Sequence, residues 1–275
     1  IDSKDSGRYI VTFSSFAPSL PKEVYEEDSG VKKDAFLKYL AKLLVLGGYS
    51  EEDAAKQAQQ YWEADKVLAA AKLEQQEYSD IDKVYNLYTM EQLKQLFPEA
   101  DLDSAFQTAG FTPTDRIQVA DVGLLEAAAP YFTEEHVELL KTRLRLELLA
   151  GLGGMLNRAF QEAGDVYQNE LVGTSGKLTD EYRASQQVQQ KFSTEVGRVY
   201  VEKYFSPEAK ADVIEMVHDF LEVYEERIRK LDWMSETTKA KAIEKLRSMN
   251  IKVGYPDEGQ WDDSMDAVEI KSAAP

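Results

Sequence analysis

The sequence predicts a mainly α fold, a multi-helix lobe with short strands near the two chain ends. From about residue 32 to residue 250, apolar side chains recur at steps of three and four, which is the spacing of amphipathic helices. Repeated N-cap signals separate these periodic segments. Two short segments, one near each end, have the β-branched and aromatic composition of strands.

The first strand is expected near Tyr9–Phe13, where Tyr, Val and Phe alternate with smaller or polar residues. Helix starts are expected at N-cap signals, in which a side-chain oxygen accepts a hydrogen bond from a backbone N–H of the first turn. These signals are Ser50 before Glu51, Thr89 with Gln92 three residues later, Thr133 before Glu134, and Ser206 before Pro207. Together with the periodic segments they predict at least seven helices.

Two long amphipathic helices are expected in succession, one starting near Thr179 and one near Pro207. The apolar stripe of the first is Val188, Phe192, Val196 and Val199, and that of the second is Val213, Val217, Phe220, Tyr224, Ile228 and Leu231. We expect both stripes to be core and the two helices to pack against each other. The closing strand is expected near Ile251–Val253, before a turn at Gly254 and Pro256, and it is a candidate to pair with the first strand.

Composition limits the partners. The chain has 275 residues, of which 43% are hydrophobic, enough for one large domain or two small ones, each with its own core. Its 32 basic and 50 acidic residues give a formal charge of −18, which repels nucleic acid and anionic membranes. No apolar run approaches the ~18 residues of a membrane span, so no membrane contact is expected from this segment. The absence of cysteine excludes disulfides and thiolate metal sites.

No catalytic, cofactor or metal site is expected in this chain. A catalytic zinc usually has three protein ligands, and the strong signature is a His-Glu-x-x-His helix. The only histidines are His136 and His218, and neither begins that motif, so we expect them to be ligands of nothing. Glu215 and His218 form one Glu-x-x-His pair, the spacing of di-metal sites in four-helix bundles, but a second pair is missing. A di-metal bundle is therefore kept as a minor alternative.

Three motifs near the end of the chain resemble consecutive landmarks of the neprilysin family of zinc metallopeptidases. They are GRVYVEKYF at 197–205, LDWMSETTKAKAIEKL at 231–246 and KVGYPD at 252–257. The resemblance continues upstream in RYIVTFSSFAPSLPKEVY at 8–25 and YNLYTMEQLKQLFP at 85–98. It covers nearly the whole chain, and the combination of motifs in order is more specific than any one of them.

The resemblance implies that residues 1–275 are the N-terminal helical lobe of a two-lobed enzyme, with a catalytic lobe as its partner. That lobe, with the His-Glu-x-x-His motif and the zinc of the full-length enzyme, is expected to lie beyond the end of this chain, which would hold no zinc itself. The helical lobe would cap the catalytic cleft and restrict substrates to oligopeptides, so this chain alone should be inactive. The family favours an extracellular or cell-surface location, and a cytoplasmic one stays open.

The same resemblance implies three candidates at the substrate cavity, Lys22, Glu23 and Tyr25, in the Leu-Pro-x-x-x-Tyr segment. Many relatives carry an arginine that resembles a substrate contact at the position of Glu23. An alternative function from a different class is a stand-alone, non-catalytic helical module that binds peptides or proteins.

Overall fold

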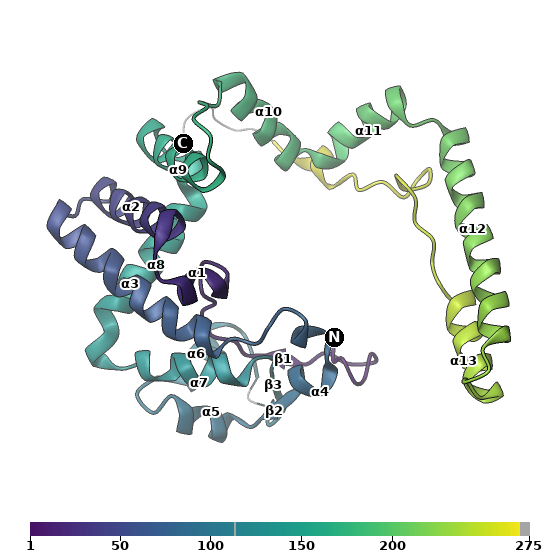
Figure 1. The fold of residues 1–275 in the computed structure, drawn as a ribbon, viewed down its shortest axis with the longest axis horizontal. Coiled ribbons are helices and arrows are strands. Elements are labelled where there is room, and N and C mark those ends of the chain that lie inside the picture. The colour runs from purple at the N-terminus through teal and green to yellow at the C-terminus, as the bar shows by residue number, and fades with distance from the viewer. Residues whose placement is uncertain (113, 270–275) are drawn as a thin grey trace. The chain divides into compact units, whose positions relative to one another are not determined.

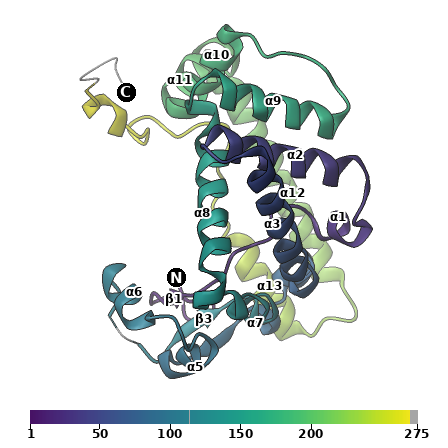
Figure 2. The same cartoon turned by 90° about the vertical axis from the view of Figure 1, so that its left-hand side faces the viewer.

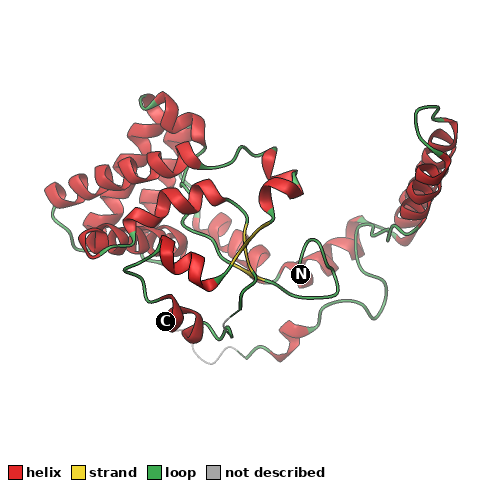
Figure 3. Cartoon of the chain, turned by 90° about the horizontal axis from the view of Figure 1, so that it is seen from below, coloured by secondary structure: helices red, strands yellow, loops and turns green. Residues whose placement is uncertain are grey.

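A computed structural model describes residues 1–112 and 114–269 and confirms the mainly α fold (Figure 1). Helices make up roughly two thirds of the described residues, about twice the usual helical share of globular proteins, which is roughly a third. Figure 3 shows how little of the ribbon is strand. The chain divides into two compact units, Ile1–Lys177 and Leu178–Pro275, and each is described by itself.

The first unit contains three short strands and nine α-helices among its described residues. The strands are β1 (Val11–Thr12), β2 (Asn86–Tyr88) and β3 (Ile117–Val119). The helices are α1 (Lys22–Glu27), α2 (Gly30–Leu46), α3 (Glu51–Ala71), α4 (Ile81–Val84), α5 (Met90–Leu96), α6 (Leu102–Thr108), α7 (Val122–Ala128), α8 (Val137–Leu152) and α9 (Arg158–Val172). Short 3-10 turns lie at Glu77–Ser79, Ala129–Tyr131, Glu134–His136 and Gly153–Met155.

The three strands form one sheet in the order β1-β3-β2, in which β1 runs parallel and β2 antiparallel to β3. The predicted first strand is thus confirmed over Val11–Thr12, with β3 as its partner. The predicted closing strand at Ile251–Val253 is wrong for the described residues, because this extended segment has no ladder partner there. A strand is defined by its pairing, which β-branched composition alone cannot supply.

Most of the predicted helix starts are confirmed by their caps. The Ser50 side chain accepts from the Asp53 N–H, and Thr89 and Gln92 form a complete capping box. Ser206 accepts from the Ala209 N–H at the start of α12. Thr133 is different: a 3-10 turn follows it, and its hydroxyl lies 2.9 Å from Nδ1 of His136 instead of capping a helix.

The core of the first unit lies between α2, α3, α8 and α9, with α2 in contact with the other three (Figure 2). Leu43, Leu44 and Trp62 are fully buried in it. A second cluster lies beneath the small sheet, where Leu93 and Ile117 are fully buried. These clusters hold α1 and the segment before it in place.

The second unit contains α10 (Asp180–Lys191), α11 (Ser193–Tyr204), α12 (Pro207–Lys230) and α13 (Glu236–Arg247), followed by a 3-10 turn at Ser264–Ala267. Within it, α10 packs against α11, and α12 packs against α13. The long helix expected from Thr179 is broken at Phe192, whose φ and ψ of −120° and 42° are not helical.

Two further predictions for this unit are wrong. The helices α11 and α12 do not pack side by side, and the apolar stripe of α12 is not core. Phe220 is 55% exposed and Tyr224 is 58% exposed. A stripe becomes core only where another surface covers it, and within this unit α13, with 12 residues, covers only part of the 24-residue α12.

Candidate functional site

The predicted substrate-cavity residues lie on α1, which starts directly after Pro21. The structure separates them by exposure. Tyr25 is only 1% exposed, Glu23 faces solvent, and Lys22 is partly buried. Lys22 Nζ lies 2.6 Å from Glu74 Oε1, and this hydrogen bond raises the pKa of Lys22. Of the three, Glu23 is therefore the side chain most accessible to a ligand.

Tyr25 is held in a buried polar network that centres on Asp65 of α3. The fully buried Asp65 carboxylate accepts from the Tyr25 hydroxyl at 2.8 Å, from the Ser19 N–H at 2.8 Å and from Arg143 Nη1 at 2.6 Å. The Tyr25 hydroxyl in turn accepts from the Leu20 N–H at 3.1 Å. The network joins the segment before α1 to helices α3 and α8.

Arg143 completes the network from α8. Its Nη2 donates to the Ala17 carbonyl oxygen at 2.5 Å, and its guanidinium lies over the rings of Phe16 and Tyr61. The Tyr61 hydroxyl and Ser19 Oγ are 2.7 Å apart. The buried Arg143 thus contacts the segment before α1 and pairs with the Asp65 carboxylate of α3.

The electrostatics of this network suit a structural role. Burial, and then the charge of Asp65, raises the pKa of Tyr25 well above its ordinary value, and the same causes raise the pKa of Tyr61 to about 12. Both phenols therefore stay protonated as donors or acceptors at neutral pH. With its carboxylate saturated by three donors, the network can orient the segment before α1 but offers no free acid or base.

Asp65 and Arg143 were not expected from the sequence. A signal for Asp65 is present, because it lies at helical spacing between the apolar Tyr61 and Leu68 of α3. A charge on an apolar stripe indicates a buried partner. The sequence does not indicate which of 32 basic residues is that partner.

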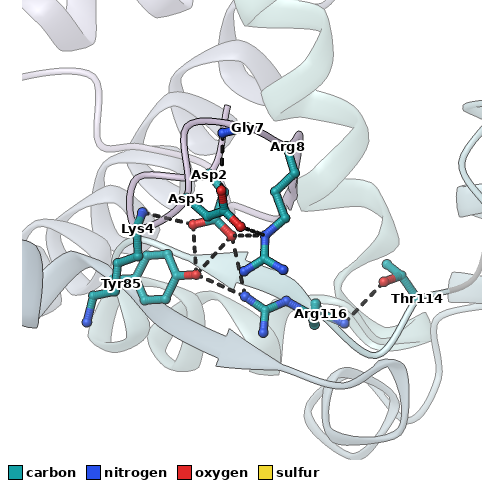
Figure 4. A network of polar contacts seen from close by, with 8 residues as sticks. All are labelled: Asp2, Lys4, Asp5, Gly7, Arg8, Tyr85, Thr114 and Arg116. Carbon is teal, nitrogen blue, oxygen red and sulfur yellow. Dashed lines mark hydrogen bonds and ion pairs between the residues drawn. The ribbon is translucent and has the colours of Figure 1, made fainter.

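A second polar network fixes the N-terminal residues (Figure 4). The buried Asp2 carboxylate accepts from the Lys4 N–H at 2.9 Å, the Tyr85 hydroxyl at 2.8 Å and Arg8 Nε at 3.2 Å, and Arg116 Nη2 lies 3.4 Å away. The Lys4 N–H contributes most to lowering the pKa of Asp2, from 3.8 to about 2, with help from Tyr85 and Arg8 against the effect of burial. This carboxylate is also saturated by its neighbours.

The described residues do not fit a zinc site. No three His, Asp or Glu side chains among them are grouped so that they could hold a metal ion. His136 contacts Thr133 and the Tyr131 ring, whereas Glu215 and His218 lie exposed on α12. Nor does the described part of the chain contain a helix long and apolar enough to cross a membrane.

Comparison with known proteins gives matches along almost the whole chain. The family described as Peptidase family M13 matches residues 1–256. The neutral endopeptidase of Lactobacillus helveticus is 28% identical over 258 residues, which are 93% of this chain and 40% of that protein. Neprilysin of Mus musculus is 24% identical, with 94% of this chain and 37% of that protein covered.

Among solved structures, the Mycobacterium tuberculosis zinc metalloprotease ZMP1 in complex with an inhibitor is similar with a TM-score of 0.78 and 28% identity. The similarity covers 95% of this chain and 40% of that one. The chain thus spans about two fifths of the length of these relatives. Because the family match covers 256 of 275 residues, the chain belongs to peptidase family M13, the neprilysin family, and represents its N-terminal region.

Proposed function

We propose that this chain is the N-terminal helical lobe of a neprilysin-like zinc metalloendopeptidase. The observation that carries the proposal is the family match over residues 1–256, combined with described residues that hold no zinc ligand set. In the complete protein, meaning this chain together with the proposed catalytic lobe, zinc would be bound by residues of that lobe. It would polarise the scissile carbonyl and activate a water molecule there.

The role proposed for the helical lobe is to cap the catalytic cleft. The close packing of the first unit supports this role. A cap can exclude folded proteins only if it is rigid, and close-packed protein interiors are rigid. Oligopeptides would pass such a wall, so size would be the first filter on substrates. The buried Asp65–Arg143 network would keep α1 at a fixed position on this wall.

Lys22 and Glu23 stay the proposed substrate contacts, and Tyr25 contributes through position because its hydroxyl is already bound to Asp65. Glu23 would favour peptides with a basic residue. The variant Glu23→Gln in the complete protein should raise KM for a basic peptide several-fold and leave kcat unchanged. Glu26→Gln, on the same helix and also exposed, is the matched control and should change neither.

The function is tested by comparing the complete protein with this chain on a quenched fluorogenic peptide with zinc present. We expect chelator-sensitive cleavage by the complete protein and none by the 275-residue chain. Chelator-sensitive cleavage by the chain alone would refute the proposed division of labour. A complete protein that binds peptides without cleaving them would favour the alternative, a non-catalytic binding module.

The cap is tested with one cleavage sequence in two contexts, as a free peptide and within a folded domain. The complete protein should cleave the peptide and leave the folded form intact. Equal rates on both would contradict the size filter and leave the peptidase assignment standing.

A further inference from the structure

The segment that follows α13 has the side-chain arrangement of a strand without being one. Ile251, Val253 and Tyr255 are half-buried, whereas Lys252 and Gly254 between them are exposed. This alternation is the period of two that an extended chain shows when one face packs and the other is open. The side chains of residues 251–253 therefore alternate as those of a strand do, up to the turn at Gly254.

Its backbone hydrogen-bonding groups are unused within the described part of the chain. The N–H groups of Ile251, Lys252 and Val253 make no hydrogen bond there, nor do the carbonyl oxygens of Ile251 and Lys252. The Val253 carbonyl accepts from the Tyr255 N–H at 2.7 Å. Such a row of free donors and acceptors is the edge on which another extended backbone adds.

Three contacts hold this edge in place at its C-terminal end. Lys210 Nζ donates to the Tyr255 carbonyl at 2.8 Å and to Asp257 Oδ1 at 2.7 Å, and it lies 4.4 Å from the centre of the Tyr255 ring. Gly254 has a φ of +64°, and a Cβ at this position would lie 2.1 Å from the Phe205 ring. The turn is thus packed against Phe205, which follows α11, and against Lys210 of α12, and these contacts pre-organise the edge.

There is also room beside the edge. A cavity of about 590 Å³ is lined by residues 250–257 together with Lys210, Ile214 and Gln260. This volume lies within the usual range of binding pockets, roughly 300 to 1,000 Å³. An extended segment can therefore approach the free backbone groups without displacing α12.

We propose that Ile251–Val253 is a docking edge for an extended segment of the proposed catalytic lobe, which adds to it as a β-strand. A free β-branched edge invites pairing between molecules, and folded proteins cover such edges. Relatives are more than twice as long as this chain, and the proposed catalytic lobe would supply the further chain that covers the edge. The inference rests on the proposed function only in requiring that further lobe.

Residue-resolved amide hydrogen exchange tests the proposal in the complete protein and in the 275-residue chain. A paired edge alternates, so either Lys252 or the pair Ile251 and Val253 should exchange at least about 100-fold more slowly in the complete protein. The loop amides of Gly176 and Lys177 serve as the internal control and should be unchanged. Equal rates in both proteins, or uniform slowing of all three amides, would overturn the proposal.

Proline substitutions give a second readout. Lys252→Pro and Val253→Pro each remove one N–H, and neighbouring N–H groups of an extended chain point to opposite edges. Only one of the two should lower the Tm of the complete protein, and neither should do so in this chain. Equal shifts in the complete protein would reject pairing. Peptide cleavage measured on the same samples separates the docking edge from the proposed peptidase function. Amide protection can be lost while cleavage persists, and cleavage can be absent while amide protection persists.

Discussion

In the first unit Leu43, Trp62 and Leu93 are fully buried, whereas in the second unit Phe220, Tyr224 and Trp233 are more than half exposed. Both units are built mainly from helices, and α10, α11 and α12 of the second unit separate their apolar and polar residues more clearly than α2, α3 and α8 of the first. The difference is that several helices and a sheet meet in the first unit, while the second pairs helices two by two. Amphipathic periodicity therefore predicts a helix reliably, but it does not predict whether its apolar stripe becomes core.

The two units should also differ in stability. Within the described residues of the second unit, Ile243 and Leu246 are the buried hydrophobic side chains. Glu225 pairs there with Arg247 and Arg229, and because both arginines are largely exposed these ion pairs contribute little to stability. We expect the second unit to open more readily than the first when this chain is studied alone.

The largest effect is expected for Asp65→Ala in the first unit. It leaves Arg143 with the partly exposed Glu147 as its remaining acidic partner, and breaking a buried ion pair typically costs about 3–5 kcal/mol of unfolding free energy. Denaturant unfolding followed by Trp62 fluorescence, with Trp233→Phe and Trp261→Phe in the background, isolates this unit. Lys141→Met, which removes an exposed ion pair from the same helix as Arg143, should cost less than about 1 kcal/mol. Equal losses of unfolding free energy for Asp65→Ala and Lys141→Met would show that the buried network stabilises the first unit no more than the exposed ion pair does.

The comparison is tested most directly by one truncation in each unit. Leu43→Ala removes a fully buried side chain and should lower the unfolding free energy by about 2–5 kcal/mol. Phe220→Ala removes a larger side chain that is mostly exposed, so in this chain its cost should stay below about 1 kcal/mol. Denaturant titrations of both variants provide the measurement. A large loss for Phe220→Ala would mean that the stripe of α12 is covered in solution.

Gly254→Ala should produce a smaller loss, confined to the second unit. The new Cβ would meet the Phe205 ring at 2.1 Å in a left-handed conformation, and overpacking of this kind costs about 1–3 kcal/mol. Gly197→Ala in α11 is the control, because a Cβ there meets nothing within 4 Å and should stabilise the helix slightly. Exchange rates of α12 and the turn report the effect. Adding Phe205→Ala should recover part of the loss, and no recovery would exclude the steric cause.

The sequence predicts those features of the fold that depend on residues close to one another in the chain. The caps at Thr89 and Ser206 were predicted because donor and acceptor lie within one helical turn. Pairings over long separations were not predictable: Ile117–Val119 became the central strand only by meeting β1 and β2.

The candidate site shows the same limit. The motif indicated Lys22, Glu23 and Tyr25, but the burial of Tyr25 depends on Asp65 and Arg143, which lie 40 and 118 residues further along the chain.

The smallest effect is a difference in acid sensitivity between the units. The pKa of Asp2 is about 2 in the folded chain against 3.8 as its ordinary value, so its contribution is present above about pH 4 and is lost as the pH falls toward 2. Asp2→Asn should flatten the loss of first-unit stability in this window, measured as the Trp62 unfolding midpoint between pH 5 and about pH 2.5. Part of the slope should persist, because hydrogen bonds from Lys33, Lys66 and Trp62 also lower the pKa of Asp28. Glu225→Gln, whose pKa is lowered by Arg247 and Arg229 in the second unit, should leave the Trp62 midpoint unchanged. An unaltered pH profile for Asp2→Asn, or an altered one for Glu225→Gln, would show that the acid response is not divided between the units in this way.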